Sequence, residues 1–166
     1  MESRAPVERS TVVRGASPRE VYDVVVDFEA YPRLFPEIKG VRVVERQANR
    51  VRVEFRAEVV LAVRYVLALM CDPEALTVDW TFVEGQVVTD SVGGWRFTPA
   101  APGSGDTRVD YRVAMTISAP LPAFLVRRAT DALVSASIPS MFAALDREVR
   151  RRRERPPSTA GGTAAP

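Results

Sequence analysis

Apolar side chains recur at every second residue in three segments of this chain, 51–59, 76–82 and 107–117. In 51–59 the intervening residues are all Arg or Glu. Successive side chains of an extended strand point to opposite faces, so this spacing predicts strands with one face on a core and one in water. With Val7–Gly15 as a first strand, the turn signals between segments predict about six further strands in an antiparallel meander.

Two segments have helical spacing instead. Ser17-Pro18-Arg19-Glu20 has the residues of a capping box with proline at the first helical position, which predicts a helix start. Residues 121–153 form a long helix with two apolar stripes on different sides. Pro139 lies between the stripes, and a proline inside a helix removes a backbone hydrogen bond, so we expect a kink near Ser135–Pro139.

These elements predict an α+β fold in which a curled antiparallel sheet of about seven strands surrounds a long C-terminal helix. Short helices follow the first strand. We assign residues 1–150 to this domain. Residues 151–166 are basic at first and then rich in Ala, Gly and Pro, which predicts a disordered tail.

The composition excludes several kinds of active site. The chain has no histidine and a single cysteine, Cys71, which excludes Ser-His-Asp triads, histidine-ligated zinc or haem, and internal disulfides. Any chemistry must therefore come from carboxylates, tyrosine, arginine, the single lysine, Lys39, or a cofactor. We assign no catalytic residue, metal or cofactor, and an enzymatic activity stays open. The N-terminus has no apolar signal region, and the longest apolar run, Val59–Cys71, is interrupted by Arg64. These features predict a soluble cytoplasmic protein.

The segment Phe28–Gly40, FEAYPRLFPEIKG, is unusual because it combines aromatic residues with Pro32 and Pro36. The prolines are incompatible with a continuous helix or a central strand, yet the segment is too apolar for an ordinary solvated loop. We predict that it covers the open end of the curled sheet. Two interpretations stay open, a gate to a cavity and a plug that fills the end of the sheet.

The motifs YPRLFPEIKGVRVVER, Trp80, GGWRF and GDTRVDYRV resemble the START-like helix-grip (SRPBCC) superfamily. Within it they are similar to the branch of coenzyme-Q-binding proteins, the ribosome-association toxin and polyketide cyclase/dehydrase proteins. The resemblance spans Val7 to Val149 and implies a START-like ligand-binding domain. It implies a deep hydrophobic cavity between the sheet and the C-terminal helix, with the loop after the first helix near its mouth. Glu37 departs from the quinone-binding relatives, which place an aromatic residue there; its carboxylate either faces solvent or gives the entrance a polar contact.

Large apolar residues on the predicted cover, strands and terminal helix are the candidate ligand-binding residues. Packing in the core is the alternative for each strand aromatic. Tyr65 and Tyr111 would add hydroxyl groups to an apolar cavity. Gly93-Gly94 predicts a bulge or a sharp bend rather than a phosphate-binding loop. The candidates are Phe28, Tyr31, Leu34, Phe35, Tyr65, Trp80, Trp95, Phe97, Tyr111, Phe124, Leu133 and Phe142.

Three functions fit the sequence. The first is non-enzymatic binding of a hydrophobic small molecule such as an isoprenoid quinone, a lipid or a polyketide-like compound. The second is a polyketide aromatase/cyclase that uses Tyr65, Tyr111 and an inward-facing arginine. The third is a module that docks on ribosomes or another large partner. The Arg147–Arg155 run is either simply solvated or a weak contact for a membrane surface or RNA. The strand Leu61–Cys71 is apolar on both faces, so its second face is covered by the chain itself or by another subunit in a homodimer.

Overall fold

The computed structural model describes residues 6–58, 60–117 and 121–155. It has a seven-stranded antiparallel sheet, short helices after the first strand, and a long C-terminal helix in three parts. The elements are β1 (Val7–Val13), α1 (Pro18–Val25), the 3₁₀ turn η1 (Phe28–Ala30), α2 (Tyr31–Leu34), β2 (Ile38–Gln47), β3 (Arg50–Glu58), β4 (Ala62–Asp72), β5 (Thr77–Gly85), β6 (Val88–Pro99), β7 (Thr107–Ile117), α3 (Ala123–Ala132), the π-helical turn η2 (Leu133–Ser137) and α4 (Ile138–Glu154).

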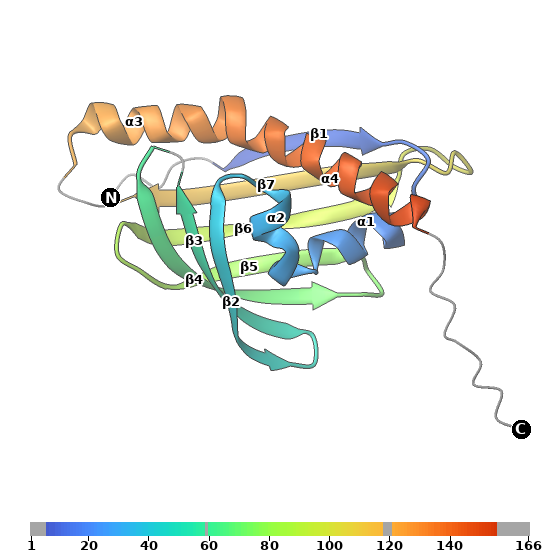
Figure 1. The fold of residues 1–166 in the computed structure, drawn as a ribbon, viewed down its shortest axis with the longest axis horizontal. Helices are drawn as coiled ribbons and strands as arrows, with labels where there is room; N and C mark the ends of the chain where they lie inside the picture. The colour runs from blue at the N-terminus through green and yellow to red at the C-terminus, as the bar shows by residue number, and fades with distance from the viewer. Residues whose placement is uncertain (1–5, 59, 118–120, 156–166) are drawn as a thin grey trace, which may run out of the picture.

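The strand order is β1-β7-β6-β5-β4-β3-β2, and every neighbouring pair is antiparallel. Strands β2 to β7 form a meander, and β1 joins it beside β7. The sheet curls, and the terminal helix runs across it with α1 and α2 beside α4 (Figure 1). The fold is the α+β arrangement that the alternating pattern predicted, a curled antiparallel sheet around a long helix, and it agrees with the helix-grip fold that the resemblance implied.

Helix α1 begins with the predicted capping box. The Ser17 hydroxyl accepts a hydrogen bond from the Glu20 backbone N–H at 3.3 Å, and the Glu20 carboxylate accepts one from the Ser17 N–H at 2.7 Å. Both donors belong to the first turn, where no helical carbonyl can reach them. This cap fixes where the chain turns from β1 into the helix that packs on α4.

The terminal helix changes direction where we expected a kink. The π-helical turn Leu133–Ser137 separates α3 from α4, and the two helices run in different directions (Figure 1). Pro139 is the second residue of α4 and has no N–H to donate to the carbonyl of Ser135, four positions earlier. The regular series of helical backbone hydrogen bonds is therefore interrupted at this point. The prediction is confirmed. Helix α4 then continues to Glu154, so residues 151–154, which we assigned to a disordered tail, are helical. Residues 156–166 of the predicted tail lie outside the described residues.

The second face of β4 and the character of the helices bear on two further predictions from the sequence. In the second face of β4, Val66 is buried by the chain's own residues while Met70 is exposed, so a homodimer through this face stays a prediction. No helix within 6–58, 60–117 and 121–155 is both long enough and apolar enough to cross a membrane.

Of the two alternatives predicted for Gly93 and Gly94, a bulge or a sharp bend, the strand pairing excludes the bulge. Strand pairing is continuous through both residues, with Gly93 opposite Val113, and the irregularity of β6 lies nearer its start. A Cβ atom on Gly93 would collide with the ring of Trp80 and with the carbonyl oxygen of Arg112. Gly93 therefore provides the space in which the Trp80 indole lies across the sheet.

Gly93→Ala is expected to lower the free energy of unfolding by about 1–3 kcal/mol, because Trp80 or the strand backbone must move. Gly103→Asn is the control, since Gly103 lies in open space with φ +72°, a conformation that asparagine tolerates. We expect this control to change stability by less than about 0.5 kcal/mol. Urea unfolding measures both, and equal losses for the two variants would contradict this role of Gly93.

Candidate ligand-binding site

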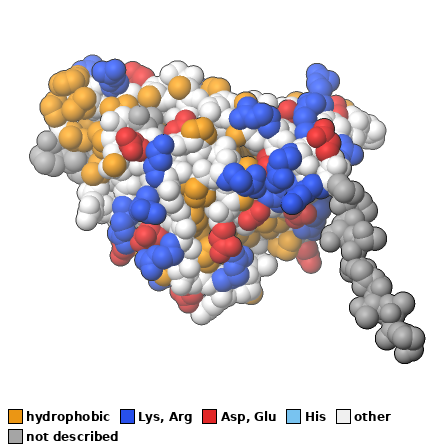
Figure 2. Space-filling view, viewed as in Figure 1, with side chains coloured by type: hydrophobic (Ala, Val, Ile, Leu, Met, Phe, Trp, Pro, Cys, Tyr) orange, Lys and Arg blue, Asp and Glu red, His pale blue; other side chains and the backbone are white. Residues whose placement is uncertain are grey.

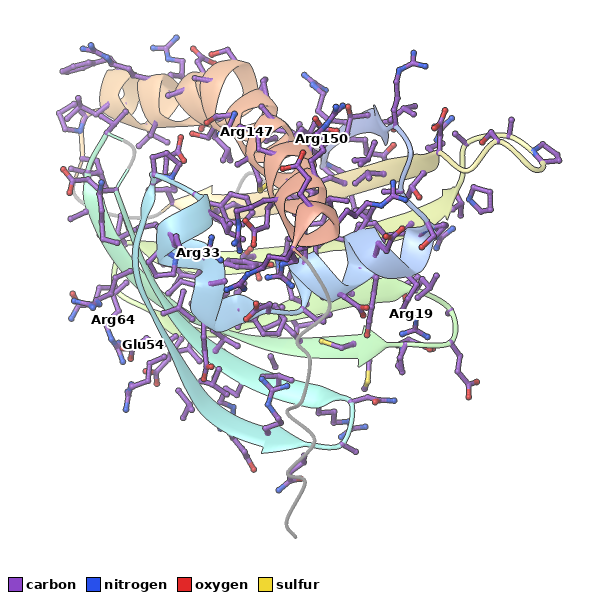
Figure 3. All side chains as sticks on the ribbon, turned by 45° about the vertical axis from the view of Figure 1, so that its right-hand side comes forward. Arg19, Arg33, Glu54, Arg64, Arg147 and Arg150 are labelled. Carbon is purple, nitrogen blue, oxygen red and sulfur yellow. The ribbon has the colours of Figure 1, made fainter. Side chains whose placement is uncertain are left out.

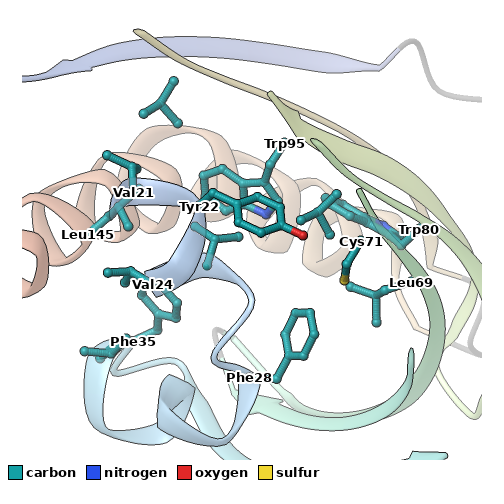
Figure 4. Close-up of a cluster of buried hydrophobic side chains, with 14 of the residues drawn as sticks. Val21, Tyr22, Val24, Phe28, Phe35, Leu69, Cys71, Trp80, Trp95 and Leu145 are labelled. Carbon is teal, nitrogen blue, oxygen red and sulfur yellow. The ribbon is translucent and has the colours of Figure 1, made fainter. Parts of the chain in front are cut away.

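A cavity of about 220 Å³ lies between the concave face of the sheet and the terminal helix. Its wall comes from the strands, from α3, η2 and α4, and from residues 28–37, which we call the cover. Phe28 on the cover points into the interior that Trp80 and Trp95 also border (Figure 4). Most of the lining side chains are apolar, so the cavity suits an apolar ligand.

Most predicted site residues line this cavity. They are Phe28, Tyr31, Phe35, Tyr65, Trp80, Trp95, Tyr111 and Leu133. The strand members share one face of the sheet because they follow the two-residue period. The shared wall shows position only, so ligand binding by these residues stays a prediction.

Four predicted site residues lie elsewhere. Leu34 and Phe97 are buried in the packed core, where the Phe97 ring lies 6.1 Å from the ring of Tyr22 on α1. Phe142 packs its edge on Tyr111, with centroids 6.4 Å apart, behind the cavity wall. Phe124 is 62% exposed, because it lies on the outer side of the first turn of α3. The apolar stripe of a helix does not reveal which of its residues reach a cavity.

The sequence reasoning missed several lining residues on the same strands. The signal was present, because these residues share the two-residue period of Tyr65 or Tyr111 and so lie on the same face. They were not selected because the prediction emphasised aromatic rings. The main ones are Leu67, Leu69, Val113 and Met115. The aromatic Phe55 was also missed; it lines the cavity from β3 and follows the two-residue period of that strand.

Tyr65 and Tyr111 are the distinctive polar groups of the wall. Neither hydroxyl donates or accepts a hydrogen bond with any residue in the described part of the chain. Both hydroxyl oxygens remain accessible from the cavity, so neither is an inaccessible unpaired group. Burial raises the pKa of Tyr65 to about 12. Burial, and then the nearby Tyr65, raises the pKa of Tyr111 further. Both phenols therefore stay protonated at neutral pH and can donate a hydrogen bond to a ligand.

Apart from the Ser137 hydroxyl, the other polar side chains of the wall are already engaged or are charged. The Tyr31 hydroxyl donates to the Val25 carbonyl at 2.6 Å, and the Trp80 indole N–H donates to the Ser91 hydroxyl at 3.2 Å. Glu37 lines the cavity from the cover and is half-buried, so the structure favours the second alternative for this carboxylate. Across the described residues, no cluster of three or more Cys, Asp or Glu side chains is arranged to hold a metal ion.

The aromatic residues of the cover pack on one another and on the sheet. The Tyr31 ring lies 5.6 Å from Phe28, 4.8 Å from Phe35 and 6.1 Å from Phe55 on β3, between ring centroids. Phe28 and Phe35 are both buried and both line the cavity. The cover thus fills the end of the sheet and also forms the cavity wall, so the gate and plug interpretations both stay open.

The cover is fixed to α4 by a cluster of ion pairs around Glu148, a carboxylate that is 3% exposed. Its oxygens lie 3.1 Å from Arg33 of α2, 2.7 Å from Arg151 and 3.0 Å from Arg152. Arg152 also pairs with Asp27, just before the cover, at 2.6 Å. We call these five residues the Glu148 cluster. Arg33 lies between α2 and α4 in Figure 3. Hydrogen bonds from Arg151, Arg33 and Arg152 hold the pKa of the Glu148 carboxyl far below its ordinary value.

The structure therefore gives the Arg147–Arg155 run a role that we did not predict. Arg150, like Arg151 and Arg152, pairs with an acidic side chain of its own helix, and Arg153 pairs with Glu20 of α1. Basic and acidic side chains accordingly gather together over α4 and α2 (Figure 2). The signal was Asp146 and Glu148 three or four residues before the arginines, the spacing at which helical side chains meet.

Comparison with known proteins gives a family and a fold. A family model described as polyketide cyclase / dehydrase and lipid transport matches residues 15–142. No match is found among curated proteins.

Solved structures with the same fold include an aromatase/cyclase, Zhui, from Streptomyces sp. R1128, at 19% identity, 90% of this chain, 95% of that chain and a TM-score of 0.80. A protein from Thermus thermophilus has 23% identity, 89% and 99% coverage and a TM-score of 0.77. A START superfamily protein from Mycobacterium smegmatis has 20% identity, 89% and 98% coverage and a TM-score of 0.71.

The Glu148 cluster predicts a specific pH dependence of stability. Because the folded state lowers the pKa of Glu148, its contribution is present above about pH 4.5 and is lost as the pH falls below that value toward the folded pKa. Glu148→Gln is expected to lower the free energy of unfolding at pH 7 by about 1–3 kcal/mol and to flatten the loss on acidification. Denaturant unfolding between about pH 7 and pH 3 measures both.

The matched control is Glu45→Gln, since Glu45 is exposed and pairs with Arg52 at 3.8 Å. We expect it to cost less than about 1 kcal/mol and to keep the wild-type acid dependence. Parallel pH curves for wild type and Glu148→Gln would show that the carboxylate does not contribute to stability in this way.

Proposed function

Because the chain belongs to the polyketide cyclase / dehydrase and lipid transport family, we propose that it is a non-enzymatic binding protein for a hydrophobic small molecule. The observation that carries the proposal is the apolar cavity, in which the hydroxyls of Tyr65 and Tyr111 have no partner among the described residues. Apolar walls with a few polar groups are typical of small-molecule sites. The ligand classes are an isoprenoid quinone, a lipid or a polyketide-like compound.

The cover supports the binding proposal because it forms part of the cavity wall. It closes the end of the sheet with aromatic rings, but its link to α4 is polar and includes Arg33, whose side chain is half-exposed. The Glu148 carboxylate is 3% exposed, but Arg151 and Arg152 of its own helix stay paired with it when Arg33 moves away, so this link can open without leaving a buried charge unpaired. A cover held in this way is suited to admit a ligand without unfolding the domain.

A polyketide aromatase/cyclase is the second candidate, and the two tyrosines favour it. A protonated phenol can donate to a ketone oxygen and so stabilise the charge that develops there in a cyclisation. The inward-facing arginine that we expected to assist is not found, because no arginine lies among the described residues that line the cavity. Product analysis after incubation with a linear poly-β-ketone separates the two candidates, since a binding protein returns the compound unchanged.

Docking on a ribosome, RNA or a membrane surface has less support from the structure. The arginines from Arg150 to Arg153 are already paired within the chain, which reduces the charge available to phosphates. Co-sedimentation of the full chain with ribosomes and with anionic liposomes tests these partners. Cytoplasmic localisation and the homodimer stay predictions from the sequence.

The binding proposal is tested first by mass spectrometry of the purified protein under non-denaturing conditions, followed by solvent extraction. We expect a co-purified apolar molecule, or saturable binding of the neutral probe N-phenyl-1-naphthylamine when the protein is purified empty. Absence of both would contradict the proposal.

Filling the cavity gives a sharper test. Ala129 lines the cavity from α3, so Ala129→Trp is expected to occupy ligand space and weaken probe binding by about tenfold or more. The matched control is Ala123→Trp, at an exposed position of the same helix, which should leave probe affinity unchanged. Melting temperatures confirm that both variants fold. Equal probe affinity for both variants would place the bound probe outside this cavity.

A further inference from the structure

We propose that the cavity selects neutral aromatic ligands that carry a carbonyl or hydroxyl oxygen, bound by the hydroxyls of Tyr65 and Tyr111, and that it rejects ligands carrying a carboxylate or phosphate. This inference rests on the proposed function and narrows its ligand class. It separates aromatic ketones, quinones and phenols from fatty acids and phospholipids.

The charge of the cavity wall disfavours an anionic ligand. Glu37 is the only charged residue among the described residues that line the cavity. A ligand carboxylate placed inside would lose its water and find no arginine or lysine to replace it, which is strongly unfavourable. The Glu37 carboxylate on the cover would also repel an anion. A neutral ligand meets neither penalty.

The cavity wall supplies uncharged hydrogen-bond donors. The hydroxyls of Tyr65 on β4 and Tyr111 on β7 make no hydrogen bond within the described residues, and the same is true of the Ser137 hydroxyl in η2. The wall therefore offers donors from two strands of the sheet, β4 and β7, and from the helix, without a charged partner. Such donors match a neutral oxygen.

Neighbouring aromatic side chains hold the two tyrosine rings in place. Tyr65 stacks on Phe55 with centroids 5.6 Å apart. Tyr111 lies 4.5 Å from Trp95 and 5.8 Å from Trp80. These neighbours restrict the tyrosines from turning away to satisfy their hydroxyls elsewhere, so the donors are preorganised for a ligand.

The aromatic side chains of the cavity wall favour an aromatic ligand. Phe55, Trp80 and Trp95 all line the cavity, and their rings lie beside the rings of Tyr65 or Tyr111. Aromatic ligands gain offset-stacked or edge-to-face contacts on such rings beyond the burial of their apolar area. A saturated chain gains only the burial. The preferred oxygen is therefore one attached to, or conjugated with, an aromatic ring.

Three probes of nearly equal size test the inference. They are 2-acetylnaphthalene, which carries a carbonyl, 2-isopropylnaphthalene, which has no oxygen, and 2-naphthoate, which is ionised at pH 7.5. Calorimetric titration of the wild-type chain should give the tightest binding for 2-acetylnaphthalene. We expect binding about threefold to tenfold weaker for the isopropyl compound and at least about tenfold weaker for the carboxylate.

Tyr65→Phe and Tyr111→Phe remove only the hydroxyl groups. Each should weaken 2-acetylnaphthalene binding about threefold to tenfold while leaving 2-isopropylnaphthalene unchanged. Tyr22→Phe is the matched control, because Tyr22 is a buried tyrosine of α1 that does not line the cavity. It should alter neither probe.

The outcomes separate this inference from the proposed function. If all three probes bind equally, or if Tyr65→Phe and Tyr111→Phe leave the preference for the carbonyl unchanged, the inference is overturned while cavity binding stands. If 2-naphthoate binds as tightly as 2-acetylnaphthalene, the rejection of anions is overturned. If none of the probes binds the wild-type chain, the proposed function itself fails and the inference fails with it.

Discussion

The Glu148 carboxylate is the interaction on which the rest of the arrangement depends. It is almost fully buried, and burial of an unpaired carboxylate would be very unfavourable. Three arginines surround it, one from α2 and two from the next turn of its own helix. Arg152 extends the network to Asp27. The Glu148 cluster thereby holds the C-terminal half of α4 against Asp27 and against Arg33 of the cover. One set of charges therefore positions both the helix and the cover.

The cavity follows from how unequally the terminal helix packs. Helix α4 buries Ile138, Leu145 and Val149 against the rest of the fold, whereas no residue of α3 is buried. The π-helical turn between them redirects the chain. One half of the helix therefore completes the core, and the other half forms the roof over a space that the concave side of the sheet does not fill. The large rings on β4, β6 and β7 border that space, and the rings of Trp95 and Tyr111 meet the helix at Phe142 of α4.

Local patterns in the sequence predicted most of the fold. The two-residue period specified the strands and the face that Tyr65, Trp80 and Tyr111 occupy, since alternation of side chains is a property of the backbone itself. The capping box and Pro139 act within one helical turn, so their effects were also visible. The relation between the aromatic cover and the end of the sheet could be inferred because no other segment combined that composition with two prolines.

The features that escaped prediction depend on contacts between distant segments. Gly93 is required by the ring of Trp80 on the neighbouring strand, which no local pattern reveals. The arginines of α4 have local partners in Asp146 and Glu148, but the pairs of Arg152 with Asp27 and of Arg153 with Glu20 join residues more than a hundred positions apart, and no local pattern reveals them. Phe97 and Phe124 were assigned to the site by residue type, but the first packs under α1 and the second faces outward.

The most direct test of the account is amide hydrogen exchange of the full chain with and without saturating N-phenyl-1-naphthylamine. The central claim is that a ligand enters the space beneath α3 and is closed in by the cover. It predicts slower exchange in residues 28–37 and in α3 when the probe is bound, because ligand contacts stabilise the closed arrangement of both. Unchanged exchange in these two segments at full saturation, with protection only on other surfaces, would contradict it.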